Sequence, residues 1–209
     1  MNFDQAAREC GIIAILRGVS PQEVLDVTAA LYDAGIRIVE VPLNSPEPFT
    51  SIEMLAKKYE GKMIVGAGTV LSVQDVQMLK NHGGQISVSP DCNQDVIARA
   101  VALGLEPLPG VFTPTEAFAA IRAGAKNLKL FPAECASPAT IKAWKAVLPK
   151  HVQIHAVGGV TPENMAQWLG AGAGGFGIGS SLYKSGAKLA TVSQSAQQLV
   201  AAWKKAKQI

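Results

Sequence analysis

Short apolar runs recur at nearly even spacing along the chain. Each run is rich in Leu or in β-branched residues and is bounded by Gly, Pro or Ser, a pattern typical of a buried strand. The runs begin at Ile12, Arg37, Met63, Gln85, Leu105, Asn127, Gln153 and Gly175. We therefore predict eight strands.

Helix signals fill the gaps between these runs. Ser20-Pro21-Gln22-Glu23 and Thr113-Pro114-Thr115-Glu116 both have the sequence of a capping box with proline at the first helical position. Glycines stand where helices are expected to end, because a residue without Cβ enters a left-handed turn cheaply. Further expected starts are Ser72, Ser137-Pro138 and Thr161-Pro162, and the expected ends are Gly35, Gly104, Gly124 and Gly172.

Eight strands alternating with eight helices predict an α/β protein with a parallel sheet. Eight units in 209 residues match a compact (β/α)8 barrel, or TIM barrel. The rival is an open doubly wound sheet, which usually has GxGxxG after its first strand. Here Arg17-Gly18-Val19-Ser20 follows that strand and lacks the motif. No linker or shift of composition interrupts the chain, so we expect one domain over residues 1–209.

Composition excludes several classes of protein. Apolar residues make up 48% of the chain, which excludes intrinsic disorder. The net charge is only +3 with no long basic run, so we expect no nucleic-acid partner. The longest uncharged stretch is rich in glycine, so we expect no membrane span. Cys10, Cys92 and Cys135 have no disulfide or metal spacing, and the N-terminus lacks a secretory signal, so we expect the cytosol and no metal.

Two strands carry an ionisable residue where an apolar one is expected. Side chains alternate along a strand, so Lys129 and Phe131 should point into the barrel while Leu128 faces the helices. Burial lowers the pKa of a lysine and makes its neutral amine available, which a Schiff-base lysine requires. The alternative is a lysine paired with a buried carboxylate for structural reasons. The position of Lys129 alone favours neither the Schiff-base interpretation nor the structural one.

The second residue is Glu40, which the same alternation turns inward. A carboxylate beside a lysine can shuttle protons through imine formation and C–C cleavage. The alternative is a structural Lys129–Glu40 ion pair. A buried pair is weak support for stability because desolvation can exceed the Coulomb gain, so function is modestly favoured.

Other candidates lie at the predicted strand ends. Arg17 could bind a carboxylate or phosphate with its planar fork, although most such arginines simply lie at the surface. Thr69 follows Gly66-Ala67-Gly68 and offers a hydroxyl, although a tight turn alone explains these glycines. Glycine-rich turns follow strands seven (Val157 to Pro162) and eight (Gly177 to Ser181), where barrels often bind phosphate. The alternative there is close packing of helix on strand.

These segments together resemble the 2-keto-3-deoxy-6-phosphogluconate (KDPG) and 4-hydroxy-2-oxoglutarate (KHG) aldolase family. The segment around the lysine, from Gly124 to Ala133, resembles that family's Schiff-base motif, and Gly35 to Val41 resembles its catalytic-glutamate segment. Gly66 to Val70, Ser89-Pro90 and Gly158-Gly159 follow in the family's order. The resemblance covers about Ile12 to Tyr183.

The resemblance implies a class I aldolase on a (β/α)8 barrel, without metal or cofactor and usually trimeric. The small-molecule partner it implies is a phosphorylated 2-keto-3-deoxy sugar acid. It assigns the imine to Lys129, the proton transfers to Glu40, the pyruvyl part to Thr69, and the distal phosphate to Gly159, Gly179 and Ser180. Phe131, next along the strand, is expected to wall the pyruvyl pocket.

The chain departs from the common pattern of that family. Pro42-Leu43-Asn44 replaces a Thr-Leu-Arg type run whose arginine binds the pyruvyl carboxylate, and Arg17 is placed to restore the charge. Val157 replaces a threonine before Gly158-Gly159, and Ser137 stands where the pattern usually has glycine. The first two changes resemble the branch that acts on 6-phosphogalactonate derivatives.

That branch implies reversible cleavage of 2-dehydro-3-deoxy-6-phosphogalactonate to pyruvate and glyceraldehyde 3-phosphate. Valine cannot hydrogen-bond the C4 hydroxyl, so this position should bias the choice of C4 epimer by roughly 0.5–1.5 kcal/mol. The alternatives are an aldolase for the gluconate epimer or for other oxo acids, a phosphosugar-binding barrel without imine chemistry, and an isomerase or epimerase barrel.

Overall fold

The computed structural model describes residues 1–207, so the last two residues of the expected domain lie outside the described part. Within that part, nine parallel strands form one sheet in the order β5-β4-β3-β2-β1-β9-β8-β7-β6. The strands are β1 (Ile12–Ile15), β2 (Ile38–Pro42), β3 (Ile64–Gly68), β4 (Ile86–Val88), β5 (Glu106–Leu108), β6 (Gly110–Val111), β7 (Asn127–Leu130), β8 (Gln153–Val157) and β9 (Gly175–Ile178). All eight predicted strands are present at their expected places.

The ninth strand arises because the fifth predicted strand is divided. Pro109 separates β5 from β6, and proline has no N–H to donate to a sheet. β5 pairs with β4 on one side, whereas β6 pairs with β7 on the other. The strands β5 and β6 are the two end strands of the sheet, and the segment from Leu108 to Gly110 joins them. The sheet therefore closes into a barrel, which confirms the predicted fold.

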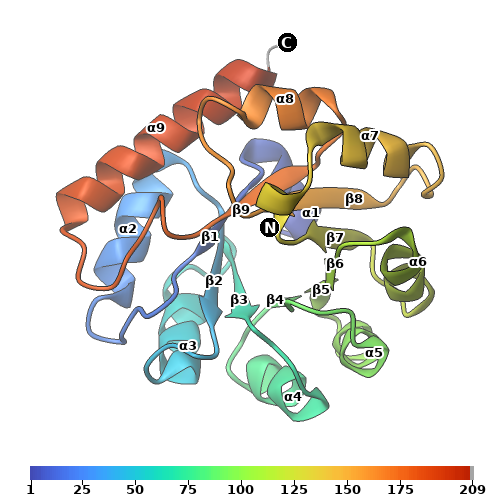
Figure 1. The fold of residues 1–209 in the computed structure, drawn as a ribbon. Coiled ribbons are helices and arrows are strands. Elements are labelled where there is room, and N and C mark those ends of the chain that lie inside the picture. Colours follow the sequence, from blue (N-terminus) through green and yellow to red (C-terminus); the bar gives the residue numbers. More distant parts are fainter. Residues whose placement is uncertain (208–209) are drawn as a thin grey trace.

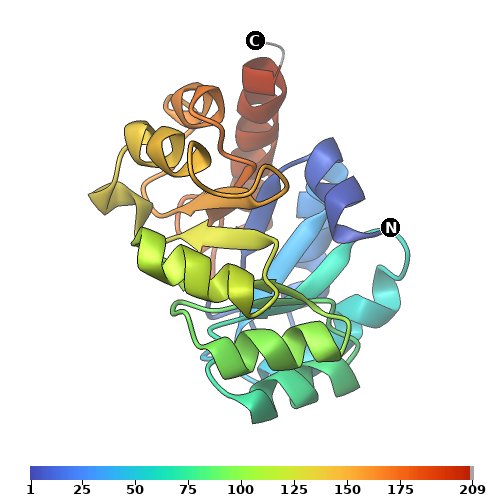
Figure 2. The same cartoon turned by 90° about the vertical axis from the view of Figure 1, so that its right-hand side faces the viewer.

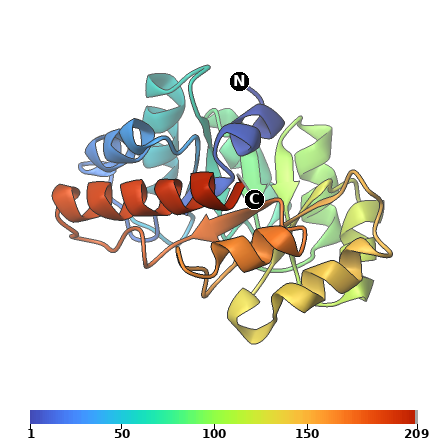
Figure 3. The ribbon, with the colours of Figure 1, turned by 90° about the horizontal axis from the view of Figure 1, so that it is seen from above.

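Helices surround the strands as an outer layer (Figure 1). Their bounds are α1 (Phe3–Glu9), α2 (Val24–Ala34), α3 (Pro48–Lys58), α4 (Val73–Asn81), α5 (Gln94–Ala102), α6 (Pro114–Arg122), α7 (Pro138–Lys145), α8 (Met165–Gly170) and α9 (Leu189–Lys207), with a 3-10 helix η1 (Ala133–Cys135). Figure 3 shows the long α9 lying across one side of the barrel, beside α2 and α8.

Most of the expected helix boundaries match the structure. Ser72, Thr113 and Ser137 are N-caps with capping boxes. The four expected helix-ending glycines all have positive φ. Two starts differ: the Ser20 segment forms a turn in which Glu23 accepts from the Ser20 N–H, and α2 begins at Val24. Thr161-Pro162 likewise precedes α8, whose N-cap is Asn164.

One helix was not expected from the apolar pattern. α1 lies at the end of the barrel where the strands begin, beside the N-terminus (Figure 2). Its Phe3 packs with the inward side chains Ile13, Ile38 and Ile64, and its ring meets the His155 ring edge-on at 5.8 Å. α1 thus closes this end with apolar side chains, and the ionisable candidates lie nearer the opposite end.

Candidate functional site

Lys129 and Glu40 both lie inside the barrel, as their alternation predicts. Lys129 is 7% exposed and Glu40 is 2% exposed. Their strand neighbours Leu128 and Val39 belong instead to the core between sheet and helices. The period of two along β7 and β2 therefore explains why two charged residues occupy an otherwise apolar interior.

Space for the Glu40 carboxylate comes from glycine in the adjacent strand. Pro42 pairs with Gly68 across β2 and β3. A Cβ at Gly68 would overlap both oxygens of the Glu40 carboxylate. Gly66, Ala67 and Gly68 lie within β3, so the interpretation of these glycines as a tight turn is wrong. Gly68 instead makes room for a buried acid.

Burial shifts the pKa of both groups toward their neutral forms. It raises the pKa of Glu40 to about 7 from an ordinary 4.5, although the charges of Lys129 and Arg17 oppose this. Burial also lowers the pKa of Lys129, where the Glu40 charge opposes the shift and the Arg17 charge adds to it. Within residues 1–207 no ion pair shorter than 4.0 Å joins Lys129 to Glu40, and Glu40 Oε2 has no hydrogen-bond partner there. A tight structural ion pair does not describe this arrangement.

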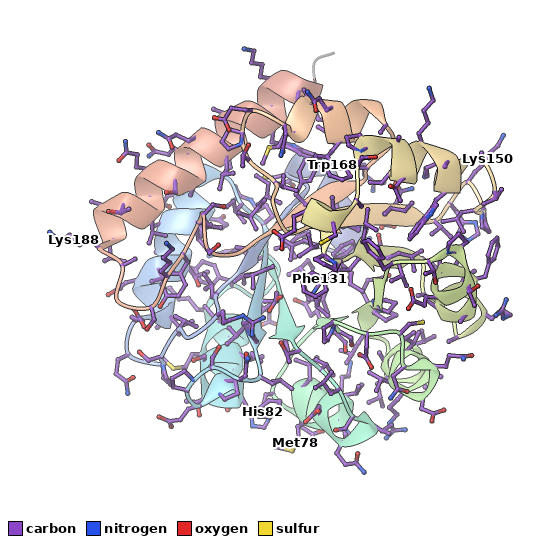
Figure 4. The ribbon with its side chains drawn as sticks, in the orientation of Figure 1. Met78, His82, Phe131, Lys150, Trp168 and Lys188 are labelled. Atoms are coloured by element: carbon purple, nitrogen blue, oxygen red, sulfur yellow. The ribbon has the colours of Figure 1, made fainter. Side chains whose placement is uncertain are left out.

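Phe131 connects the buried lysine to the open end of the barrel. The Lys129 Nζ atom lies 4.5 Å from the centre of the Phe131 ring, in cation–π geometry. Phe131 follows the last residue of β7 and is 37% exposed. Figure 4 shows it near the centre of the ring of helices, whereas Met78, Lys150 and Lys188 lie at the periphery.

A cavity of about 480 Å³ lies at this end of the barrel. It brings together seven predicted site residues, namely Arg17, Phe131, Val157, Gly158, Gly159, Gly179 and Ser180. Lys129, Glu40 and Thr69 are not among the residues that line it. Lys129 instead lies beneath Phe131, which does line it. Ile15 and Val157 give one wall an apolar surface next to Gly177.

Arg17 lies at the rim as predicted, and its side chain is held in place. Its Nη1 donates a hydrogen bond to Asn44 Oδ1 at 2.5 Å. Asn44 follows β2 at the position of the arginine in the common family pattern. The structure therefore places the replacement residue directly against the arginine expected to compensate for it.

Thr69 has an unusual backbone conformation. Its φ is +58°, in the left-handed region that a β-branched residue rarely enters. Such strain costs about 1–3 kcal/mol and tends to persist at functional sites. Thr69 directly follows Gly68, and hence lies next to the residue that makes room for Glu40.

The glycine turn after β8 is fixed by its own hydrogen bonds. Asn164 donates to the Gly159 carbonyl at 2.9 Å and accepts from the Thr161 N–H at 2.9 Å. The φ values of Gly158 and Gly159 are +103° and +68°. These φ values favour glycine, so the turn has no side chains of its own at these two positions.

The cavity also includes residues that the sequence reasoning did not select. The charged ones are Glu134, on η1, and Lys184, in the loop between β9 and α9. Both are exposed, and neither lies in a motif. The only signal in the sequence was their position shortly after a predicted strand end.

No helix within residues 1–207 has the length and apolar character needed to cross a bilayer. No group of three or more His, Cys, Asp or Glu side chains there is arranged to hold a metal ion.

Comparison with known proteins gives consistent matches. The family model for KDPG and KHG aldolase matches residues 3–197. The 2-dehydro-3-deoxy-6-phosphogalactonate aldolase of Escherichia coli (strain K12) is 47% identical over 197 residues, covering 94% of this chain and 96% of the relative. A solved structure described as native KDPGal is 47% identical with a TM-score of 0.93, covering 95% of this chain and 96% of that one.

A further solved structure is similar to nearly the whole of this chain. It is a cube-shaped, highly porous protein cage designed by fusing symmetric oligomeric domains. It is 46% identical with a TM-score of 0.94, covering 96% of this chain and 74% of that one.

Proposed function

The chain belongs to the KDPG and KHG aldolase family, and we propose how its residues catalyse the aldol cleavage. It is a carbon–carbon lyase that reversibly cleaves 2-dehydro-3-deoxy-6-phosphogalactonate to pyruvate and glyceraldehyde 3-phosphate. The residue assignment rests on the buried Lys129, whose pKa is lowered, in the same barrel interior as Glu40, whose Oε2 has no hydrogen-bond partner among residues 1–207.

Lys129 is the nucleophile. Its neutral amine attacks the C2 ketone of the substrate and forms a carbinolamine, which loses water to give a protonated imine. The C3–C4 bond then breaks, because the imine accepts the electron pair and becomes an enamine. Protonation of the enamine at C3 and hydrolysis of the imine release pyruvate and regenerate the amine.

Glu40 moves the protons in this sequence. Its pKa of about 7 lies near neutral pH, where a group can both give and accept a proton efficiently. It protonates the leaving hydroxyl of the carbinolamine and removes the proton of the C4 hydroxyl as the C3–C4 bond breaks. The unpartnered Oε2 is available for this exchange, directly or through one water.

The pyruvyl end of the substrate is held near Lys129. Arg17 binds the carboxylate through its guanidinium fork. Thr69 holds the pyruvyl part, and Phe131 forms a wall of its pocket. These assignments are supported by the Arg17 charge, which acts on both Lys129 and Glu40, and by the position of Phe131 over the lysine.

The distal phosphate binds at the glycine turns. Gly158, Gly159, Gly179 and Ser180 offer backbone N–H groups around the cavity, a recurrent arrangement in this class of barrel. Lys184 adds a positive charge in the same lining. Val157 forms the apolar wall that faces the C4 hydroxyl. Because valine cannot hydrogen-bond this hydroxyl, the galactonate epimer can compete with the gluconate epimer.

The functional unit is a homotrimer of single-domain chains in the cytosol. Support for symmetric assembly comes from the family resemblance and from the designed cage, whose building blocks are symmetric oligomeric domains. Support for one domain comes from the single sheet that includes every described strand. Support for a reducing compartment comes from the three free cysteines.

Borohydride reduction in the presence of pyruvate tests the central step. The wild-type chain should gain one covalent three-carbon adduct, located on Lys129 by peptide mass spectrometry. Lys129→Ala should gain none, and Lys126→Ala, which alters an exposed lysine three residues earlier, is the matched control. Absence of an adduct on wild type would support a phosphosugar-binding barrel without imine chemistry. Assaying both C4 epimers tests the substrate, because faster cleavage of the gluconate form contradicts the galactonate assignment.

A further inference from the structure

Two hydrogen bonds link the loops that follow β1 and β2. The Arg17 guanidinium donates to the Asn44 side chain, and the Gly18 N–H donates to Ser45 Oγ at 3.0 Å. The strands behind them are in register, with Ile15 opposite Glu40. Arg17 is therefore tethered to the chain segment that begins only a few residues after the catalytic acid.

We propose that Asn44 is a positioning residue that aims Arg17 at the substrate carboxylate without neutralising its charge. The proposal rests on the proposed function, in which Arg17 binds that carboxylate. Asn44 does not touch the reacting atoms and acts only through the arginine.

Asn44 is a neutral hydrogen-bond acceptor, so it leaves the positive charge of Arg17 available to the substrate. A guanidinium has five N–H donors, and the bond to Asn44 engages only the Nη1 group, so other donors stay available for a bidentate carboxylate contact. An aspartate has nearly the same shape as asparagine, but its negative charge would form an ion pair with Arg17 and compete with the substrate for it.

The orientation of Arg17 also affects the catalytic pair. Burial is the largest cause of both pKa shifts, raising the pKa of Glu40 and lowering that of Lys129, and the charge of Arg17 contributes a smaller lowering to each. The structure gives Arg17 no other hydrogen-bond or ion-pair partner among residues 1–207. Loss of the Asn44 contact therefore lets the arginine sample other orientations, which should alter both the affinity for pyruvate and the pH profile.

The experiment compares Asn44→Ala and Asn44→Asp with wild type, alone and combined with Arg17→Ala. Half-saturation for pyruvate is read from borohydride trapping over a wide concentration range. The matched control is Asn81→Ala, which removes a surface asparagine that accepts from Gln77 at 2.9 Å on α4. Far-UV circular dichroism and thermal melting confirm that each variant is folded.

Asn44→Ala should raise the half-saturation concentration about three- to tenfold, the value of one hydrogen bond, with a smaller change in the maximal trapping rate. Asn44→Asp should raise it further, although it preserves side-chain shape. Asn44→Ala should have no further effect in the Arg17→Ala background, because the alanine change acts only through the arginine.

Three results would overturn the inference while leaving the aldolase assignment intact. These are an unchanged half-saturation in Asn44→Ala, an effect of Asn44→Ala that persists without Arg17, or an aspartate variant that binds pyruvate as well as wild type. Absence of any adduct on the wild-type chain is a different result, since it removes the proposed function and the inference together.

Discussion

Replacing Glu40 with glutamine should make the protein more stable at alkaline pH and far less active. Glutamine keeps the shape of the side chain but cannot ionise. In the folded chain the pKa of Glu40 is about 7, whereas an ordinary glutamate has 4.5. The folded state thus holds this proton more tightly than the unfolded state, so wild-type stability falls as pH rises from about 4.5 to 7.

The magnitude follows from the size of that shift. Each pKa unit corresponds to about 1.4 kcal/mol, so ionisation of Glu40 costs the folded state roughly 3 kcal/mol once pH exceeds 7. Glu40→Gln avoids this cost. The free energy of unfolding of the variant minus that of wild type should therefore increase by about that amount between pH 4.5 and pH 8.

Activity should change in the opposite direction. Loss of a general acid–base typically lowers kcat by about 10²- to 10⁴-fold. The wild-type rate should rise with pH through about 7 as Glu40 ionises. This rise should be absent from the pH–rate profile of the variant. Pyruvate binding should persist, because Lys129 and Arg17 remain.

The assays are urea unfolding at several pH values between 4.5 and 8, and pyruvate release over the same range. Parallel stability profiles for the two proteins would refute the raised pKa. A near-normal rate in the variant would remove Glu40 from the mechanism. Greater stability together with loss of rate would show that the acid is retained at a cost to folding, which a structural ion pair does not predict.

Three further changes test the cavity. Val157→Thr should shift the ratio of cleavage rates of the two C4 epimers toward the gluconate form by about two- to tenfold; an unchanged ratio in a parallel assay contradicts the role of this wall. Lys184→Ala should raise KM for the phosphorylated substrate several-fold more than it raises half-saturation for pyruvate, and equal effects on both would place the lysine away from the phosphate. Gly159→Ala should lower stability by about 1 kcal/mol or more, because φ is +68° and the new Cβ would lie 2.8 Å from Glu134 Cβ; an unchanged melting temperature would show that the turn relaxes freely.

Local pattern accounted for much of the fold. A strand places alternate residues on opposite faces, so the apolar runs indicated both the strands and the inward direction of Lys129 and Glu40. Capping depends on residues three positions apart, so the start at Thr113 could be inferred as well. The Ser20 segment shows the limit, because its side-chain contacts form but the helix begins only at Val24.

Contacts between distant segments could not be inferred in this way. Asn44 and Arg17 are 27 positions apart, and their hydrogen bond exists because β1 and β2 pair in register. Lys184 reaches the cavity from a loop without a motif. The depth at which Glu40 is buried, and hence its raised pKa, depends on the glycine that the neighbouring strand places beside it.

The amino-acid order therefore specifies the strand and helix segments and the face on which each ionisable residue lies, because these depend on neighbours within one turn or two strand positions. Closure of the sheet across Pro109 and lateral pairing of the strands decide which of these residues meet. Only the closed barrel brings residues from β1, β2 and β7 into one buried interior. That burial shifts the pKa of Lys129 and the pKa of Glu40 toward the neutral form of each side chain.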